Sequence, residues 1–368
     1  MSEQKLTTLY NLLQAADLDA AALNPGSTLT YMTGLHFHLM ERPIVLLLAQ
    51  GATPTIILPQ LETGKASASS IPLQHFPYGE NPDNWSHAFQ QACDSLQLNG
   101  KTVGVEPTRM RVLELRFLEE AAPEAKFTPA DKALTSLRIQ KDEQEITHMR
   151  QAVKIAQHAL SETLPLIRIN TSEREIASEL TMQLLRAGSE SGIPFSPIVA
   201  SGPNSANPHS TPSDRPIAPG DLLLFDWGAS YQGYCSDITR TFAVGEIDPE
   251  LRKIFQIVAE ANAAGRHSAA PDIEVCLVDL AARDIITLAG YGNYFIHRTG
   301  HGLGMESHEP PYIHSENTMK FSPGMTFTIE PGIYLPDRGG VRIEDNVIIT
   351  ADGAESLTDF PRELTTIG

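Results

Sequence analysis

The chain has few cysteines, and their arrangement excludes a disulfide framework. Cys93, Cys235 and Cys276 are its three cysteines, and no two of them are spaced as C-x-x-C. Scattered cysteines of this kind are typical of the reduced core of an intracellular protein. We therefore expect a cytoplasmic protein that does not bind a metal through thiolates.

Long apolar runs and an excess of basic charge are also missing. The run from Ile44 to Ala49 is far shorter than the roughly 20 residues of a membrane-spanning helix. The N-terminal stretch MSEQKLTTLYNLLQ lacks the basic start, apolar centre and cleavage site of a signal peptide. With 27 Lys and Arg against 45 Asp and Glu, the net charge is −18. This balance disfavours nucleic acid and anionic membranes as partners, so we expect neither.

The length of 368 residues predicts two domains, because a single core seldom grows to this size. Residues 1–130 begin with an amphipathic helix, and two more helical stretches are expected at 85–97 and 110–121. Short strand-like runs lie between the helices, at 20–23, 44–48, 55–58 and 102–106. This alternation predicts a small α/β domain. The stretch 122–141 is interpreted as a connector.

Residues 131–368 are expected to form the second and larger domain. Helices are predicted around 146–160 and 176–184, followed by a loop over 194–220 and a strand hairpin. Two further helices at about 250–265 and 275–290 precede a second hairpin. The order helix, helix, hairpin therefore occurs twice, which indicates a weak internal repeat.

Four carboxylates lie in the two hairpins. Asp226 and Asp237 occur in LLLFDWGASYQGYCSDITRTFAV, and Glu330 and Glu344 occur in FTIEPGIYLPDRGGVRIEDNVII. If each run folds back at its glycine turn, each pair becomes opposed, with Cβ atoms about 4.5–5.5 Å apart. Buried acids this close repel each other unless cations lie between them. The sequence therefore predicts a site for divalent metal, with two ions.

His301, in the glycine-rich stretch HRTGHGLG, is the best imidazole ligand for such a site. His297 lies four residues before it, but the glycines argue against a helical zinc pair and favour an irregular loop. One imidazole among carboxylates suits Mn²⁺, with Co²⁺, Zn²⁺ or Fe²⁺ as alternatives. The competing interpretation, ordinary acids at strand ends and turns, fits two mirrored pairs poorly.

Two adjacent divalent ions define a class of reaction. They lower the pKa of a bridging water and polarise a carbonyl, which favours hydrolysis of an amide. A carboxylate that touches the water can carry its proton to the leaving amine. Glu330 is our candidate for this role.

These motifs carry a resemblance to a known family. FDWGASYQGYCSDITRTF, HRTGHGLGMESHEPP, FTIEPGIYLPDRGG and VRIEDNV resemble those of the pita-bread metallopeptidases, in the proline-specific branch of prolidase (Xaa-Pro dipeptidase) and aminopeptidase P. The resemblance covers about 140–368 and a creatinase-like N-terminal domain before it. It implies an α+β fold with domains at 1–130 and 131–368.

The resemblance also implies roles for the five ligands. Asp226 and Asp237 would chelate one ion, and Asp237 would also reach the other. His301 would bind the second ion, Glu344 would bridge both, and Glu330 would be both ligand and proton shuttle. Creatinase-type amidinohydrolases share the fold without this ligand set, so its presence counts against their chemistry.

Four further residues match family positions near the substrate. His209 in NPHSTP and His308 in SHEPP are implied to face the substrate and take part in catalysis. His297 and Arg342 are implied to bind the substrate as well, and Arg342 could orient the glutamate pair or a substrate carboxylate. The implied substrate is a small peptide with proline after the scissile bond.

Two questions remain open at this point. The enzyme could be a dipeptidase or an aminopeptidase acting on longer peptides, and the compact chain favours the dipeptidase. His36, His38 and Arg42 in GLHFHLMERP could cap the cleft of their own or a partner subunit, and the resemblance implies a homodimer. A non-peptidase hydrolase of this fold, or a peptide-binding protein without catalysis, are the less favoured alternatives.

Overall fold

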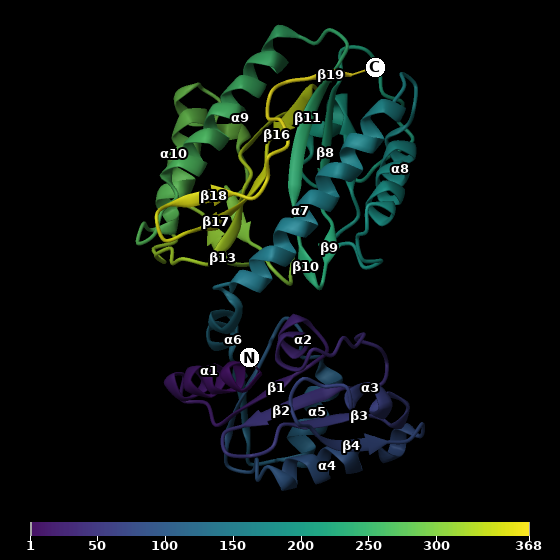
Figure 1. Cartoon of the computed structure of the whole chain (residues 1–368), viewed down its shortest axis with the longest axis vertical. Helices are drawn as coiled ribbons and strands as arrows, with labels where there is room; N and C mark the ends of the chain where they lie inside the picture. Colours follow the sequence, from purple (N-terminus) through teal and green to yellow (C-terminus); the bar gives the residue numbers. More distant parts are fainter. Residues whose placement is uncertain (1, 368) are drawn as a thin grey trace. The chain divides into compact units, whose positions relative to one another are not determined.

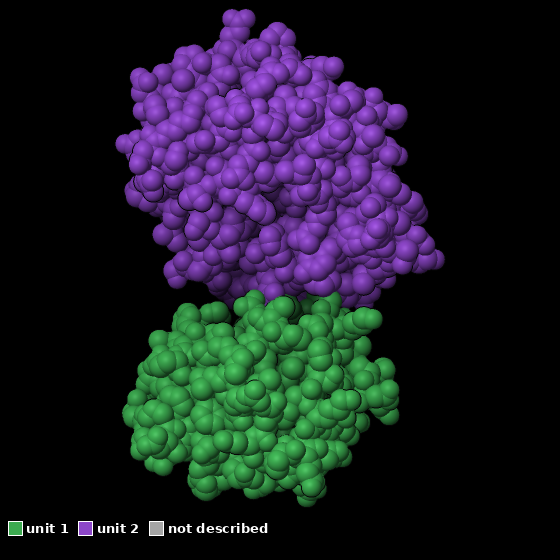
Figure 2. Space-filling model, turned by 180° about the vertical axis from the view of Figure 1, so that it is seen from behind, with its two compact units in different colours: residues 1–138 green, residues 139–368 purple. Residues whose placement is uncertain are grey.

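The computed structural model describes residues 2–367. The chain divides into two compact units, residues 1–138 and 139–368, which are coloured separately in Figure 2. Each unit has its own sheets and its own apolar cores. No helix within residues 2–367 combines the length and the apolar character that crossing a membrane requires.

Unit 1 is built on a mixed sheet of six strands in the order β4-β3-β2-β1-β5-β6. Its strands are β1 (Ala20–Leu23), β2 (Val45–Ala49), β3 (Thr55–Pro59), β4 (Gln74–Tyr78), β5 (Thr102–Val105) and β6 (Lys126–Pro129). The central strand β2 is apolar on both faces, since Val45 and Leu47 enter one core and Leu46 and Leu48 the other. Alternate residues of a strand point to opposite faces, so helices are needed on both sides of this sheet.

Two groups of helices supply that cover. The helices are α1 (Ser2–Ala15), α2 (Ser27–Thr33), α3 (Thr63–Ala66), α4 (Trp85–Ser95), α5 (Val112–Ala121) and α6 (Asp131–Arg138). Leu9 of α1 and Leu134 of α6 pack in one core, whereas Phe89 of α4 and Leu118 of α5 pack in the other. The predicted α/β pattern is confirmed, but α2, α3, α6, β4 and β6 were not predicted. The stretch interpreted as a connector contains β6 and α6, and β4 and β6 are short, proline-bearing edge strands with a weak sequence signal.

Unit 2 contains two larger sheets and two small hairpins. The four-stranded sheet runs β19-β11-β8-β7 and the five-stranded sheet runs β13-β12-β14-β17-β18. Their strands are β7 (Ile198–Ser201), β8 (Leu222–Trp227), β11 (Ile238–Val244), β12 (Gly300–Gly302), β13 (Glu309–Ile313), β14 (Thr326–Ile329), β17 (Asp345–Ile349), β18 (Ala354–Ser356) and β19 (Thr366–Ile367). The hairpins are β9 (Ser230–Tyr231) with β10 (Tyr234–Cys235), and β15 (Gly332–Leu335) with β16 (Gly339–Arg342).

Four long helices complete unit 2: α7 (Glu143–Thr163), α8 (Glu173–Arg186), α9 (Pro249–Ser268) and α10 (Val275–Leu288). Three of them begin at sequence-encoded caps. Asp142 with Glu145, and Ser172 with Glu175, form capping boxes at α7 and α8, while the Asp248 side chain caps α9. Such caps satisfy backbone N–H groups that have no partner inside the helix. All four helices were predicted.

The helices cover the strands from two sides, as Figure 1 shows, with α7 and α8 on one side and α9 and α10 on the other. Trp227 of β8 fixes α7 in place, because its indole N–H donates to the carbonyl of Ala156 at 2.8 Å. Val258 of α9 packs with Ile333 and Ile343 in a separate core. The predicted repeat of two helices and a hairpin is therefore present.

The strand register corrects one prediction and supports another. Asp226 lies opposite Thr239, not Asp237, because β9 and β10 close on Gln232 and Gly233. The offset is two residues, so Asp226 and Asp237 still share a face, whereas an offset of one would have separated them. In the second hairpin Ile329 pairs with Asp345, and this register places Glu330 opposite Glu344 as predicted.

Two expected loops contain strands. The segment 194–220 includes β7, and Ile198 of β7 pairs directly with Asp226. His301 was expected on an irregular loop but lies in β12, where it pairs with Tyr312 of β13. A bulge follows His301. Glycines on both sides of His301 give no side-chain alternation, which hides this strand in the sequence.

Candidate metal centre

Hydrogen bonds between Thr239 and Glu344 help to join the two carboxylate hairpins. The backbone N–H of Glu344 donates to the carbonyl of Thr239 at 3.1 Å, and the Thr239 hydroxyl donates to the Glu344 carboxylate at 2.6 Å. The strand after Asp237 is thereby paired with the residue that precedes β17. All four acids consequently line one cavity of about 750 Å³ in unit 2.

The acids and His301 form two groups that share one member. Asp226, Asp237 and Glu344 form the first group, and His301, Glu330 and Glu344 form the second. Within each group, one donor atom per residue lies within 4.8 Å of the others. The His301 Nε2 atom lies 3.3 Å from Glu330 Oε1 and 3.7 Å from Asp237 Oδ2. Each group could hold a metal ion, and Glu344 is common to both groups.

The electrostatics of the first group call for positive charge. Burial raises the pKa of Asp226, and burial together with the neighbouring carboxylates raises the pKa values of Asp237 and Glu344 well above their usual range. Within the described residues 2–367, the buried Oδ1 atom of Asp226 has no hydrogen-bond partner. The unpartnered buried oxygen of Asp226 and the mutual repulsion of the acids both fit a bound divalent ion. This set of oxygens with one imidazole suits Mn²⁺ and related ions.

Glu330 behaves differently from the other three acids. Burial would raise its pKa, but the hydrogen bond and charge of His301 outweigh burial and lower that pKa to about 2. The Thr328 hydroxyl also contacts Glu330 Oε1, at 3.3 Å. Glu330 therefore stays ionised beside the imidazole, in a side chain that is 15% exposed toward the cavity.

His308 lies against His301 at the mouth of the site. Their ring centroids are 3.9 Å apart at an interplanar angle of 84°. His308 also completes a third group of possible donors with Asp237 and His301. Burial and the neighbouring His301 lower the pKa of His308 to about 4, so its exposed ring is neutral at pH 7.

Arg342 is held by four contacts inside the site. Its Nη2 donates to Asp226 Oδ2 at 2.6 Å, and its Nε donates to the Thr239 hydroxyl at 3.0 Å. Its Nη1 donates to the hydroxyl of Tyr334 at 2.9 Å and to the carbonyl of Pro208 at 3.3 Å. Arg342 thus contacts Asp226 directly and reaches Glu344 only through Thr239.

His297 continues this network away from the acids. Its Nδ1 lies 2.7 Å from the carbonyl of Arg298, and its Nε2 lies 2.8 Å from the Tyr334 hydroxyl. These partners assign the proton to Nδ1, so that Nε2 accepts from Tyr334. Burial lowers the pKa of His297, which keeps the ring neutral. Asp226, Arg342, Tyr334 and His297 therefore form one continuous hydrogen-bonded chain.

The remaining predicted residues lie at the rim or in unit 1. His209 is exposed beside the cavity, in a turn where its N–H donates to Asn207 Oδ1 at 3.1 Å. In unit 1, the rings of His36 and His38 are 5.3 Å apart, and Arg42 pairs with Glu80 at 3.1 Å. The expected capping role of these three residues stays a prediction.

Several residues of the site were not identified from the sequence. Phe195, Ile198, Arg298 and Ser307 line the cavity, and Tyr334 bridges Arg342 to His297. Arg298 lies inside the motif HRTGHGLG, and its charge next to His297 was a usable signal. Phe195 and Ile198 carried no signal, because the segment that holds them was interpreted as a plain loop.

Comparison with known proteins agrees with this geometry. Residues 147–351 match the model of metallopeptidase family M24, and residues 5–140 match the creatinase/prolidase N-terminal domain. The chain is 35% identical over 360 residues to an Xaa-Pro dipeptidase of Lactobacillus delbrueckii subsp. lactis, covering 98% of each.

Solved structures are similar over the same length. A recombinant prolidase from Thermococcus sibiricus is 35% identical with a TM-score of 0.94, covering 100% of this chain and 99% of that one. An X-Pro aminopeptidase from Thermotoga maritima MSB8 is 31% identical with a TM-score of 0.86, also covering 100% and 99%. Both kinds of proline-directed peptidase are thus represented among its relatives.

Proposed function

Because the chain belongs to metallopeptidase family M24, in its proline-specific pita-bread branch, we propose that it is an Xaa-Pro dipeptidase with two divalent ions. The observation that carries this proposal is the convergence of four acids and His301 in one cavity of about 750 Å³. Relatives that match almost the whole chain and are named Xaa-Pro dipeptidases support the substrate class.

Five residues would hold the metal. Asp226 and Asp237 would hold one ion, His301 and Glu330 would hold the other, and Glu344 would contribute to both. Asp237 also reaches the second position, since its Oδ2 lies 3.7 Å from His301 Nε2. We propose Mn²⁺ for this donor set, with Co²⁺, Zn²⁺ and Fe²⁺ as alternatives.

Bound divalent ions would lower the pKa of a water molecule and polarise the scissile carbonyl. The protein's own part is to move the proton. Glu330 takes the proton from the attacking water and delivers it to the proline nitrogen as the C–N bond breaks and the new C–O bond forms. This delivery matters because the proline nitrogen carries no hydrogen of its own in the peptide bond.

The neutral rings around the acids are proposed to orient the substrate. His308 and His209 lie at the cavity mouth and present ring nitrogens to a bound peptide. His297 contributes a ring held in place by Tyr334 at 2.8 Å. Arg342 pairs with Asp226 and holds that ligand in place. We therefore propose that Arg342 acts on the substrate indirectly, by positioning Asp226.

An Xaa-Pro aminopeptidase is the second candidate, favoured by the similarity to the Thermotoga maritima structure. Hydrolysis of Ala-Pro and Ala-Pro-Ala by the Mn²⁺-loaded protein separates the two. We expect cleavage of Ala-Pro alone. Cleavage of Ala-Pro-Ala at a comparable kcat/KM would identify an aminopeptidase, and cleavage of neither would reject both.

Two further proposals concern the setting of the enzyme. Cys93, Cys235 and Cys276 are buried and free, which supports a reducing, cytoplasmic location. A homodimer, with His36, His38 and Arg42 capping a cleft, stays a prediction from the family resemblance. Light scattering of the purified protein at several concentrations measures its mass directly.

A further inference from the structure

We propose that unit 2 binds a phosphate-bearing small molecule in a second cavity, lined by arginines. This cavity of about 730 Å³ is lined by Arg252, Arg266 and Arg362, with Phe255 and Leu364 beside them. It shares no lining residue with the cavity of the candidate metal centre. The proposal therefore does not depend on the peptidase activity.

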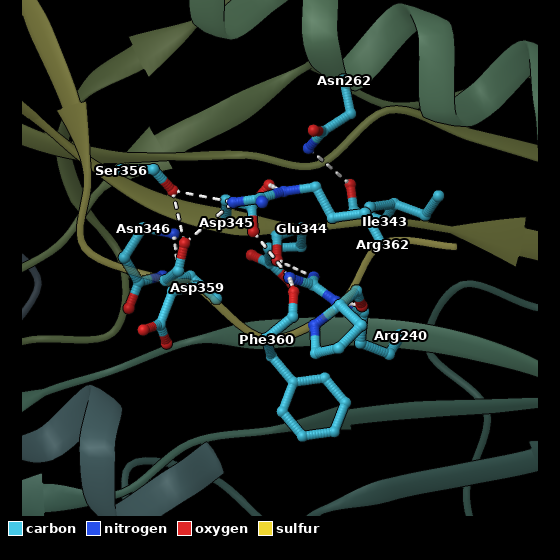
Figure 3. A network of polar contacts seen from close by, with 12 residues as sticks. Arg240, Asn262, Ile343, Glu344, Asp345, Asn346, Ser356, Asp359, Phe360 and Arg362 are labelled. Carbon is cyan, nitrogen blue, oxygen red and sulfur yellow. Dashed lines mark hydrogen bonds and ion pairs between the residues drawn. The ribbon is translucent and has the colours of Figure 1, made fainter. Parts of the chain in front are cut away.

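Asp345 is the centre of an unbalanced group of charges. Its carboxylate is fully buried and lies 2.8 Å from Arg240 Nη2 and 2.7 Å from Arg362 Nε, as Figure 3 shows. Arg266 Nε lies 3.5 Å from the same carboxylate. Asp345 thus faces three guanidinium groups. With Arg252, Asp359 and Glu363 of the cavity lining included, four arginines stand against three acids, which leaves an excess of one positive charge.

Two further acids, Asp359 and Glu363, also line this cavity, and their hydrogen-bond donors are uncharged groups. The Glu363 carboxylate accepts the backbone N–H of Arg362 at 3.1 Å, and Asp359 accepts the side-chain amide of Gln157 at 2.7 Å. Both side chains are exposed, so water screens the interactions of their charges. Burial, and after it the adjacent Arg362, lower the pKa of Arg266.

Donor groups remain available at this site. Arg266 uses its Nε on Asn262 Oδ1, at 2.9 Å, while its two Nη atoms have no hydrogen-bond partner within the described residues. The Arg252 guanidinium likewise has none in that part of the chain. A guanidinium fork binds the oxygens of phosphate in pairs.

Charge and size together select the ligand. A phosphate monoester carries about −1.5 to −2 at neutral pH, and its oxygens can accept from both guanidinium groups that keep free Nη donors, Arg252 and Arg266. A volume of about 730 Å³ lies within the usual range of small-molecule pockets, about 300–1,000 Å³. Phe255 and Leu364 offer apolar surface to the body that carries the phosphate.

Calorimetric titration of the metal-loaded protein with inorganic phosphate, at constant ionic strength in chloride, tests the proposal. We expect Arg252→Gln and Arg266→Gln each to raise the Kd for phosphate at least tenfold. Arg174→Gln, which removes an exposed arginine paired with Asp214 elsewhere in unit 2, should leave the Kd within twofold. Arg252 bonds to no described side chain, so Arg252→Gln should retain metal content and peptidase activity.

Three outcomes would overturn the proposal. Absence of binding to the unsubstituted protein removes the site. Unchanged affinity in both variants would place the phosphate elsewhere, for example at the metal ions. Acetate or citrate binding as tightly as phosphate would show that the cavity selects carboxylates instead.

Discussion

Glu344 and Asp345 follow each other in the chain, yet their carboxylates lie in opposite electrostatic surroundings. Glu344 faces other acids in the metal cavity, and its pKa is raised well above the usual range by burial and by Glu330 and Asp226. Asp345 is equally buried, but Arg240 and Arg362 lower its pKa against the effect of burial. One step along a strand reverses the side-chain direction, so a single segment serves both surroundings.

The difference teaches how to separate a functional acid from a structural one. Burial alone does not do so, because both carboxylates are about equally inaccessible. Asp345 is neutralised by arginines of its own chain and needs nothing else. Within the described residues, the Glu344 carboxylate accepts a side-chain hydrogen bond from the Thr239 hydroxyl, and a bound cation would balance its charge. The unmatched carboxylate is the one that marks the reaction centre.

The largest effect on activity is expected from a substitution in the group of cavity acids that includes Glu344. Asp237→Asn removes one negative charge from the group that faces the metal. We expect loss of bound metal and at least a roughly 10³-fold fall in kcat/KM, equivalent to about 4 kcal/mol. Elemental analysis and Ala-Pro hydrolysis measure the two losses.

The matched control for this variant is Asp284→Asn, at an exposed position of α10. It changes the net charge by the same amount and should leave both readouts unchanged. Full turnover by Asp237→Asn would show that Asp237 is not a ligand.

A second pair of substitutions tests both sides at once in metal-free protein. Asp345→Asn should lower the free energy of unfolding by about 3–5 kcal/mol, because it leaves buried arginines unpaired. Glu344→Gln should instead raise the free energy of unfolding, since it relieves repulsion among the cavity acids. Urea unfolding monitored by circular dichroism measures both, and destabilisation by the two variants alike would contradict the comparison.

The same pair predicts opposite dependence on pH. An acid with a raised folded pKa binds more protons in the native state, so metal-free protein should lose stability as pH rises above the unfolded values of about 4. Asp345 has a lowered folded pKa, and its contribution is present above about 3.9 and lost below it as pH falls through the folded pKa. We expect metal-free protein to be more stable at pH 5 than at pH 7, and Glu344→Gln to reduce this difference.

Much of the fold could be predicted because its signals are local. The capping boxes at Asp142 and Ser172 join residues three positions apart. The apolar spacing of α7 to α10 likewise involves residues that are close in the sequence. The Glu330 and Glu344 hairpin was also predictable, because its turn lies near Asp337 and is followed directly by Gly339 and Gly340. The Asp226 and Asp237 register was wrong by two residues, and the prediction of a shared face survived only because two is the strand period.

The rest of the site depends on contacts that no local pattern records. Thr239 meets Glu344 across 105 residues, and Arg342 meets Asp226 across 116. The sequence offered Arg342 as a partner for glutamates or substrate, whereas the structure joins it to an aspartate on another sheet. Tyr334 was missed for the same reason, since its role exists only once Arg342 and His297 are side by side.

The smallest effect concerns the edge of the acidic cavity, where His308 could act as a ligand or as a substrate contact. Its ring lies 3.9 Å from that of His301, but it is the exposed member of the pair. We expect His308→Ala to retain both metal equivalents and to lower kcat for Ala-Pro roughly 10²-fold, the usual contribution of one positioned proton-transfer or hydrogen-bonding group. His314→Ala, at a half-buried histidine outside the cavity, is the control. Loss of one metal equivalent in His308→Ala would instead make His308 a second imidazole ligand. Cation binding would then depend less on the unmatched carboxylates than the comparison of Glu344 with Asp345 predicts.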